Sequence, residues 1–133
     1  MAKPIDSRPI VLDTTAILAV LFSEPGSERL PPLLQRSAVS AVSLSEVYVH
    51  LLRRGVKPAL AWKSLQDLGL EVCPFDVQQA HLAGELVEAT SNSRLSLGDR
   101  ACLALALQRK AVVYTTDAAW KELNAGVAVE LIR

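Results

Sequence analysis

Residues 9–22 read PIVLDTTAILAVLF, a short apolar run that ends in the acid Asp13 and continues directly into a longer apolar segment. An uninterrupted apolar run of this length is typical of a strand buried on both faces of a sheet. Residues 14–22 have the length and composition of a helix, and Pro25 and Gly26 follow it as breakers. The stretch therefore predicts a buried strand that turns into a helix, with a carboxylate at the turn.

The remainder of the chain repeats this alternation of short apolar runs and longer segments. Further strands are expected at residues 38–41, 70–73, 112–115 and 127–132. Helices are expected at residues 26–36 (interrupted at 31–32 by two prolines), 43–54, 58–68, 76–90, 96–109 and 118–124. This order favours an α/β fold with a parallel sheet covered on both faces. We expect a single domain over residues 1–133, with residues 1–8 as a flexible N-terminal extension.

The composition narrows the class of protein. Half of the residues are hydrophobic and 21% are charged, which excludes a disordered chain. Fourteen basic residues balance 14 acidic ones, so any binding of nucleic acid has to rest on local charge. Cys73, Cys102 and both histidines stand alone, which argues against a zinc site. No run is apolar enough to cross a membrane and the start lacks a signal-peptide core, so we expect a cytoplasmic protein without a membrane partner.

Four acids stand where a strand is expected to end or a helix to begin: Asp13, Glu46, Asp99 and Asp117. Each has a purely structural explanation as a helix cap. SLSE at residues 43–46 and SLGD at residues 96–99 both match the capping-box pattern, and the other two acids stand at expected N-cap positions. Considered one at a time, the acids are explained at least as well by capping as by chemistry.

Their joint placement favours a metal site. The carboxyl ends of parallel strands meet at one edge of the sheet, which is where open α/β folds bind ligands. Two like charges about 4 Å apart cost roughly 4 kcal/mol at an effective dielectric constant near 20, so clustered carboxylates call for a cation. Oxygen ligands without His or Cys suit Mg²⁺ or Mn²⁺, and phosphodiester hydrolysis is the reaction that such a site fits best.

Four segments together resemble the PIN-domain family, and within it the VapC-like ribonuclease toxins of toxin–antitoxin pairs. They are VLDTTA (residues 11–16), SLSEV (43–47), LSLGDRA (95–101) and VYTTDAAW (113–120). The resemblance extends from about Pro9 to the end of the chain. It implies a three-layer α/β/α PIN-like fold with five parallel strands in the order 3-2-1-4-5 and helices on both faces.

The resemblance also implies a function. It implies endonucleolytic cleavage of RNA with Mg²⁺ or Mn²⁺ as cofactor, and a VapB-like antitoxin that blocks the site. Its catalytic and metal-binding acids correspond to Asp13, Glu46, Asp99 and Asp117.

Other residues are candidates for supporting roles. Thr15 and Thr115 match hydroxyl positions that orient the carboxylates or their waters, although Thr15 stands where the family is expected to have Ser or Asn. Arg94 and Arg100 flank the third acid and are candidate contacts to substrate phosphates, with a surface charge as the simpler explanation of each. Apolar positions in the expected helices 43–54 and 58–68 offer a surface for an antitoxin helix or a second copy, and we expect a homodimer.

Three alternatives remain open from the sequence. A phosphatase of the DxDxT type begins similarly, but position 15 is Thr where that motif needs a second acid. A PIN nuclease of RNA processing would carry the same acids. A non-catalytic PIN-like module that binds RNA or a protein partner would have no need of all four.

Overall fold

The structure is a computed structural model of the chain and describes residues 7–90 and 94–133. Five strands form one parallel sheet in the order β3-β2-β1-β4-β5, which confirms the predicted order. The strands are β1 (Ile10–Leu12), β2 (Ser37–Ser40), β3 (Glu71–Cys73), β4 (Val112–Thr115) and β5 (Ala128–Leu131). β1 lies in the centre, so the residue that follows it, Asp13, stands in the middle of the carboxyl edge.

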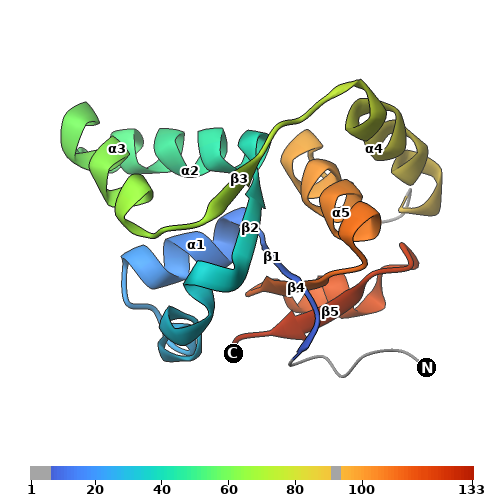
Figure 1. Ribbon diagram of the computed structural model, residues 1–133, viewed down its shortest axis with the longest axis horizontal. Coiled ribbons are helices and arrows are strands. Elements are labelled where there is room, and N and C mark those ends of the chain that lie inside the picture. Colours follow the sequence, from blue (N-terminus) through green and yellow to red (C-terminus); the bar gives the residue numbers. More distant parts are fainter. Residues whose placement is uncertain (1–6, 91–93) are drawn as a thin grey trace.

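Helices cover both faces of the sheet, as the α/β/α prediction requires (Figure 1). One face carries α1 (Thr14–Leu21), α2 (Ala41–Arg53) and α3 (Pro58–Asp67). The other face carries α4 (Val77–Ala89) and α5 (Leu97–Arg109). Short 3-10 helices complete the described chain: η2 (Ser27–Arg29), η3 (Pro31–Arg36) and η4 (Ala118–Glu122).

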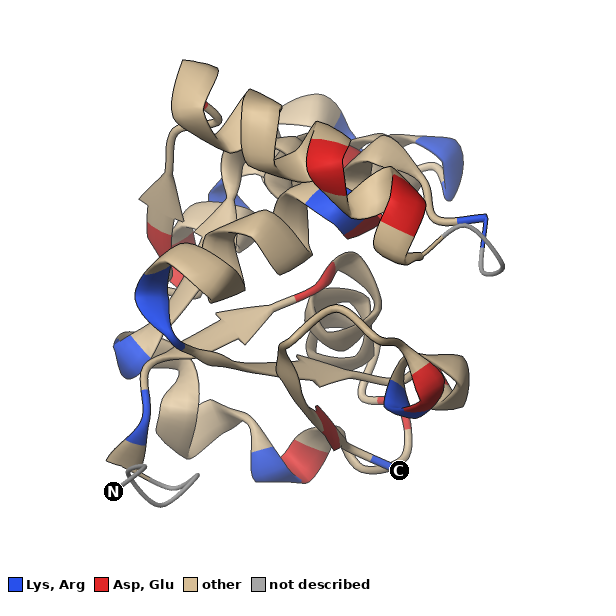
Figure 2. Ribbon diagram, turned by 90° about the vertical axis from the view of Figure 1, so that its right-hand side faces the viewer, with Lys and Arg blue, Asp and Glu red and all other residues tan. Residues whose placement is uncertain are grey.

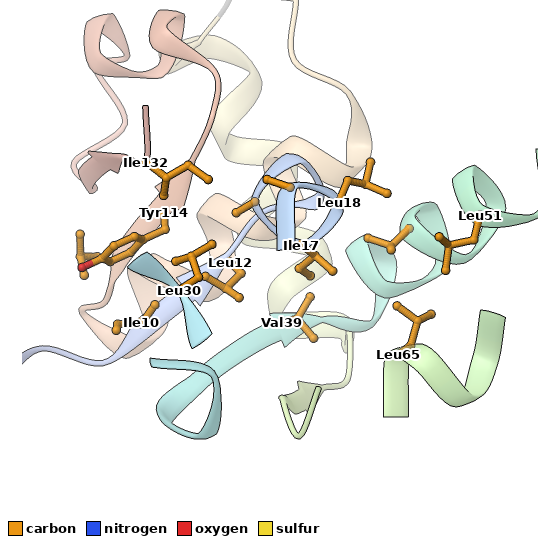
Figure 3. Close-up of a cluster of buried hydrophobic side chains, with 14 of the residues drawn as sticks. Ile10, Leu12, Ile17, Leu18, Leu30, Val39, Leu51, Leu65, Tyr114 and Ile132 are labelled. Atoms are coloured by element: carbon orange, nitrogen blue, oxygen red, sulfur yellow. The ribbon is translucent and has the colours of Figure 1, made fainter. Parts of the chain in front are cut away.

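The alternation of side chains along β1 explains its continuous apolar sequence. Ile10 and Leu12 pack with α1 to α3 in one hydrophobic cluster, which also contains Tyr114 of β4 (Figure 3). Val11 and Val113 point to the opposite face and pack with α4 and α5. Because both faces are covered, every position of the central strand is buried.

One expectation about local structure was confirmed and one was wrong. Residues 26–36 are interrupted before the prolines at 31 and 32, as expected, because proline cannot donate the backbone hydrogen bonds of a continuous helix; both segments are short 3-10 helices. Helix α2 begins at Ala41, two residues before its expected start. The Ser40 side chain accepts a hydrogen bond from the Val42 amide (3.2 Å) and takes the N-cap position that was assigned to Ser43.

The expected N-terminal extension falls mostly on residues 1–6, which lie outside the described residues. At its end, the carbonyl of Arg8 accepts a hydrogen bond from the Arg36 guanidinium (2.9 Å). The single-domain organisation over residues 1–133 stays a prediction.

Candidate active site

Asp13 is the N-cap of α1 and lies in the interior, with 3% of its surface exposed. Its carboxylate accepts hydrogen bonds from the Ala16 amide (2.8 Å), the Thr15 hydroxyl (2.8 Å) and the Thr115 hydroxyl (2.6 Å). Burial raises the pKa of Asp13 to about 6, although these three hydrogen bonds lower it; the negative charge of Asp99 raises it further. The site therefore contains a buried carboxyl group whose charge the protein alone stabilises incompletely.

The two predicted supporting hydroxyls lie on either side of this carboxylate. The Thr15 and Thr115 oxygens are 3.2 Å apart and connect the end of β1 to the end of β4. Each oxygen also accepts a hydrogen bond from a backbone amide. The Thr116 amide donates to Thr15 (3.0 Å), and the Asp117 amide donates to Thr115 (3.0 Å). The position of the Asp13 carboxylate thus depends on both strands.

Glu46 lies in the second turn of α2 and is not part of a capping box, because the helix begins earlier than expected. Its carboxylate accepts a hydrogen bond from the Thr14 hydroxyl (2.9 Å). It also lies against Gly98 at the start of α5, so closely that a methyl group there would overlap the carboxyl carbon and both oxygens. Glu46 therefore meets the first residue of α1 and the first turn of α5.

Asp99 and Asp117 are helix caps, which confirms the capping role that the sequence predicts for each. Asp99 forms a complete capping box with Ser96: its carboxylate accepts from the Ser96 amide (3.0 Å), and the Ser96 hydroxyl accepts from the Asp99 amide (3.1 Å). Asp117 is exposed, and its carboxylate accepts from the Ala119 amide (3.0 Å) at the start of η4. Capping fixes where both carboxylates stand and leaves each an oxygen for other contacts.

The pKa of the Cys102 thiol responds to several of the acids. It is buried one turn after Asp99 on α5, and burial raises its pKa well above the ordinary value. The charges of Asp13, Asp99 and Glu46 raise this pKa further, so all three lie within electrostatic reach of one buried atom. Asp117 contacts the same group through its backbone amide, which donates to the Thr115 hydroxyl (3.0 Å).

The acids fit a divalent cation by their chemistry. All of their ligand atoms are oxygens, as Mg²⁺ and Mn²⁺ prefer, and a cation would offset the cost of burying Asp13 beside other negative charges. Among residues 7–90 and 94–133, no three Asp, Glu, His or Cys side chains are close enough together to surround one ion. Each carboxylate is directed toward a hydroxyl or amide donor in its own vicinity.

The two candidate arginines differ in their surroundings. The Arg100 guanidinium donates to the carbonyl of Ala83 (3.1 Å), a contact that joins α5 to α4. Arg94 is exposed and follows residues 91–93, which lie outside the described part of the chain. A contact of either side chain with substrate stays a prediction.

Sequence reasoning missed Thr14 and Gly98, although both carry a local signal. Thr14 is a hydroxyl residue beside Asp13, and only Thr15 was singled out from the pair. Gly98 lies within a helix, where glycine is disfavoured unless another group needs its space. The group that takes this space, the carboxylate of Glu46, is 52 positions away in the chain (98 − 46) and is brought there by the fold.

None of the described helices is long and apolar enough to cross a membrane.

Comparison with known proteins assigns the family. The family model of the PIN domain matches residues 10–126. Ribonuclease VapC42 of Mycobacterium tuberculosis is 32% identical over 108 residues, covering 73% of this chain and 82% of that protein, and a VapC ribonuclease of Mycobacterium bovis matches equally. DNA-bound VapBC from Salmonella typhimurium superposes with a TM-score of 0.79 at 20% identity, covering 95% of this chain and 99% of the other. VapBC-5 from Mycobacterium tuberculosis gives a TM-score of 0.65 at 26% identity, covering 94% and 98%. The chain therefore belongs to the PIN-domain family.

Proposed function

We propose that this protein is a metal-dependent endoribonuclease and the toxin of a VapBC-type toxin–antitoxin pair. The observation that carries the proposal is a series of contacts that connects the four acids. Thr115 joins Asp13 to Asp117, and Glu46 contacts Thr14 and Gly98, the chain neighbours of Asp13 and Asp99. The 32% identity to VapC ribonucleases supports the reaction class. Membership of the PIN-domain family supports the assignment of the four acids to the catalytic site.

The proposed roles follow from the environment of each acid. Asp13, fixed by Thr15 and Thr115, and Glu46, fixed by Thr14, would hold Mg²⁺ or Mn²⁺ together with Asp99. A divalent cation in this position supplies Lewis acidity toward a phosphate oxygen and lowers the pKa of water. Asp117 stands at the exposed rim of the same edge, where it can orient a water or complete the ligand set.

Protonation of Asp13 would limit metal binding at this site. Asp13 holds a cation only as a carboxylate, and its pKa of about 6 means that a large part of the metal-free protein is protonated there below that pH. Thr15 and Thr115 donate to the carboxylate and therefore favour its charged form. We expect metal binding to release a proton from Asp13 in mildly acidic solution.

Cleavage of RNA tests the activity. Purified protein is incubated with a structured RNA and Mg²⁺ or Mn²⁺, and the products are mapped by primer extension. We expect internal cuts that EDTA prevents and that Asp13→Asn abolishes. Asp67→Asn is the matched control, because this acid pairs with Lys63 on the exposed side of α3 (2.9 Å) and has no contact with the site. Equal cleavage by wild type and Asp13→Asn would assign the activity to a contaminating nuclease.

A VapB-like antitoxin is the proposed partner, and a homodimer the proposed assembly. The similarity to chains from VapBC complexes supports a fold that can take such a partner. Co-expression with the product of a short reading frame directly upstream should yield a stable complex in which RNA cleavage is inhibited. A nuclease of RNA processing would instead remain active with that product present.

A further inference from the structure

We propose that Thr14 and Gly98 are positioning residues that hold the Glu46 carboxylate in the acidic site. Thr14 supplies a hydrogen bond and Gly98 supplies the space. The inference rests on the proposed metal-dependent function, because it assigns these residues a role through a ligand of that site. Neither residue is proposed as a ligand of the cation.

The Thr14 contact joins two elements that enter the site from different directions. Its hydroxyl donates to Oε1 of Glu46 at 2.9 Å, across 32 positions of the chain. Thr14 immediately follows Asp13 in the chain. The Asp13 carboxylate accepts hydrogen bonds from the Thr15 hydroxyl and the Ala16 amide. The first turn of α1 thus fixes two acids at once, one with its backbone and Thr15, the other with Thr14.

Gly98 permits the close approach of the helices. The Glu46 carboxyl group occupies the position in which any other residue would place its Cβ. The φ of Gly98 is not among the positive values of the chain, so the backbone itself has no need of glycine here. Space is therefore the physical reason for glycine. The overlapping atoms are the end of a flexible side chain, so an alanine would displace the Glu46 carboxylate.

A long, flexible side chain that serves as a metal ligand benefits from such restraints. Glu46 has three rotatable side-chain bonds, so its carboxylate could take many positions at the start of α1 and α5 if nothing held it. The Thr14 hydroxyl and the packing against Gly98 restrict it to one side of the site before a cation binds. Such prior restriction lowers the entropy that metal binding has to remove.

Mn²⁺ affinity measured by titration calorimetry, independent of any RNA cleavage, tests the role of Thr14. Residues that orient a metal ligand typically change metal affinity 10- to 100-fold, so we expect Thr14→Val to weaken Mn²⁺ binding about tenfold. Thr14→Ser keeps the hydroxyl and should bind within about twofold of wild type. Thr90→Val is the matched control: it removes a buried hydroxyl that donates to the Leu86 carbonyl (2.6 Å) on α4, and Mn²⁺ binding should not change.

A double-mutant cycle separates positioning from a general structural effect. If Thr14 acts through Glu46, Thr14→Val should have no further effect on Mn²⁺ affinity once Glu46→Gln is present. An equal loss in both backgrounds would overturn the proposal, as would wild-type affinity of Thr14→Val. If the wild type itself binds no Mn²⁺, the proposed metal-dependent function is contradicted. This outcome can be distinguished from the two above, in which the wild type binds Mn²⁺ and only the role of Thr14 is contradicted.

Gly98→Ala provides a second, independent variant. Alanine favours a helix more than glycine, so α5 itself should not be weakened. We expect about tenfold weaker Mn²⁺ binding because the methyl group displaces the Glu46 carboxylate. Glu46→Asp, which shortens the side chain, should cost less affinity in the Gly98→Ala background than in the wild type. Unchanged binding by Gly98→Ala would contradict the role assigned to this position.

Discussion

Burial and hydrogen bonding have opposite effects on the pKa of Asp13. Hydrogen bonds from Thr115, Ala16 and Thr15 favour its charged form, and burial disfavours it more strongly, so the pKa rises to about 6. At neutral pH the group is mostly ionised, and the folded protein then contains a negative charge that water would solvate better. This unfavourable charge is what a bound cation would offset.

The first prediction concerns the pH dependence of stability without metal. The folded-state pKa of Asp13 (about 6) exceeds its ordinary value of 3.8, so the folded state binds the proton more tightly than the unfolded state. Protonation of Asp13 therefore adds about 3 kcal/mol to the free energy of unfolding. This contribution is fully present below pH 3.8 and is lost as the pH rises through 6. Urea unfolding in EDTA at a series of pH values measures it. Asp13→Asn should lack this component, and an unchanged profile in that variant would contradict the assignment.

The second prediction concerns Thr115, which donates the 2.6 Å hydrogen bond to Asp13. Thr115→Val removes a donor to a charged group and should destabilise the metal-free protein by about 2 kcal/mol at pH 8. The loss should be smaller at pH 5, where the carboxyl group is mostly protonated. Thr90→Val, which loses a hydrogen bond to the neutral Leu86 carbonyl, should cost about 1 kcal/mol at both pH values by urea unfolding.

Among the elements, α5 connects stability to the site. Its segment from Ala101 to Ala106 is buried between the sheet and α4, while its first turn presents Gly98 and Asp99 to the acidic group. The capping box of Ser96 and Asp99 fixes where this helix begins. The position of one ligand candidate therefore depends on a cap that also stabilises the helix.

The third prediction tests this cap. Ser96→Ala removes the hydroxyl that accepts from the Asp99 amide and should lower the free energy of unfolding by about 1 kcal/mol. Ser64→Ala on α3 is the control, because that hydroxyl donates to a carbonyl within its own helix and should have a smaller effect on thermal unfolding. Equal losses in the two variants would show that the cap adds nothing to α5.

Element by element, the sequence predicted what depends on neighbouring residues. Asp13, Asp117 and the Ser96–Asp99 box were recognised as caps because their partners lie within three positions. The start of α2 was placed too late because Ser40 and Ser43 are both acceptable caps, and only the end of β2 at Ser40 decides between them.

For the whole molecule, charge is balanced and spread out. In the view of Figure 2, Lys and Arg alternate with Asp and Glu over several elements of the coloured chain, and no broad basic face is seen from that side. Substrate RNA would consequently be held by local contacts and by the proposed metal site, because a general electrostatic attraction is weak at zero net charge.

The fourth prediction concerns the folded protein and its cation. The proposed metal site exists only in the folded state, so Mn²⁺ at about 100 times its Kd should raise the free energy of unfolding by about 2.7 kcal/mol and increase the melting temperature. Asp99→Asn should reduce this gain, and Asp67→Asn, on the exposed side of α3, should not. A wild-type melting temperature that does not respond to Mn²⁺ would contradict the clustered-acid site.

The sequence by itself determined the alternation of strands and helices, the parallel sheet and the identity of four candidate acids, because apolar runs, breakers and caps act over a few residues. Only the tertiary structure decided which groups meet. It placed Glu46 between Thr14 and Gly98, directed Arg100 to the Ala83 carbonyl, and left Asp117 exposed at the start of η4. Contacts between residues tens of positions apart depend on how whole helices pack on the sheet, and this packing is a property of the assembled core.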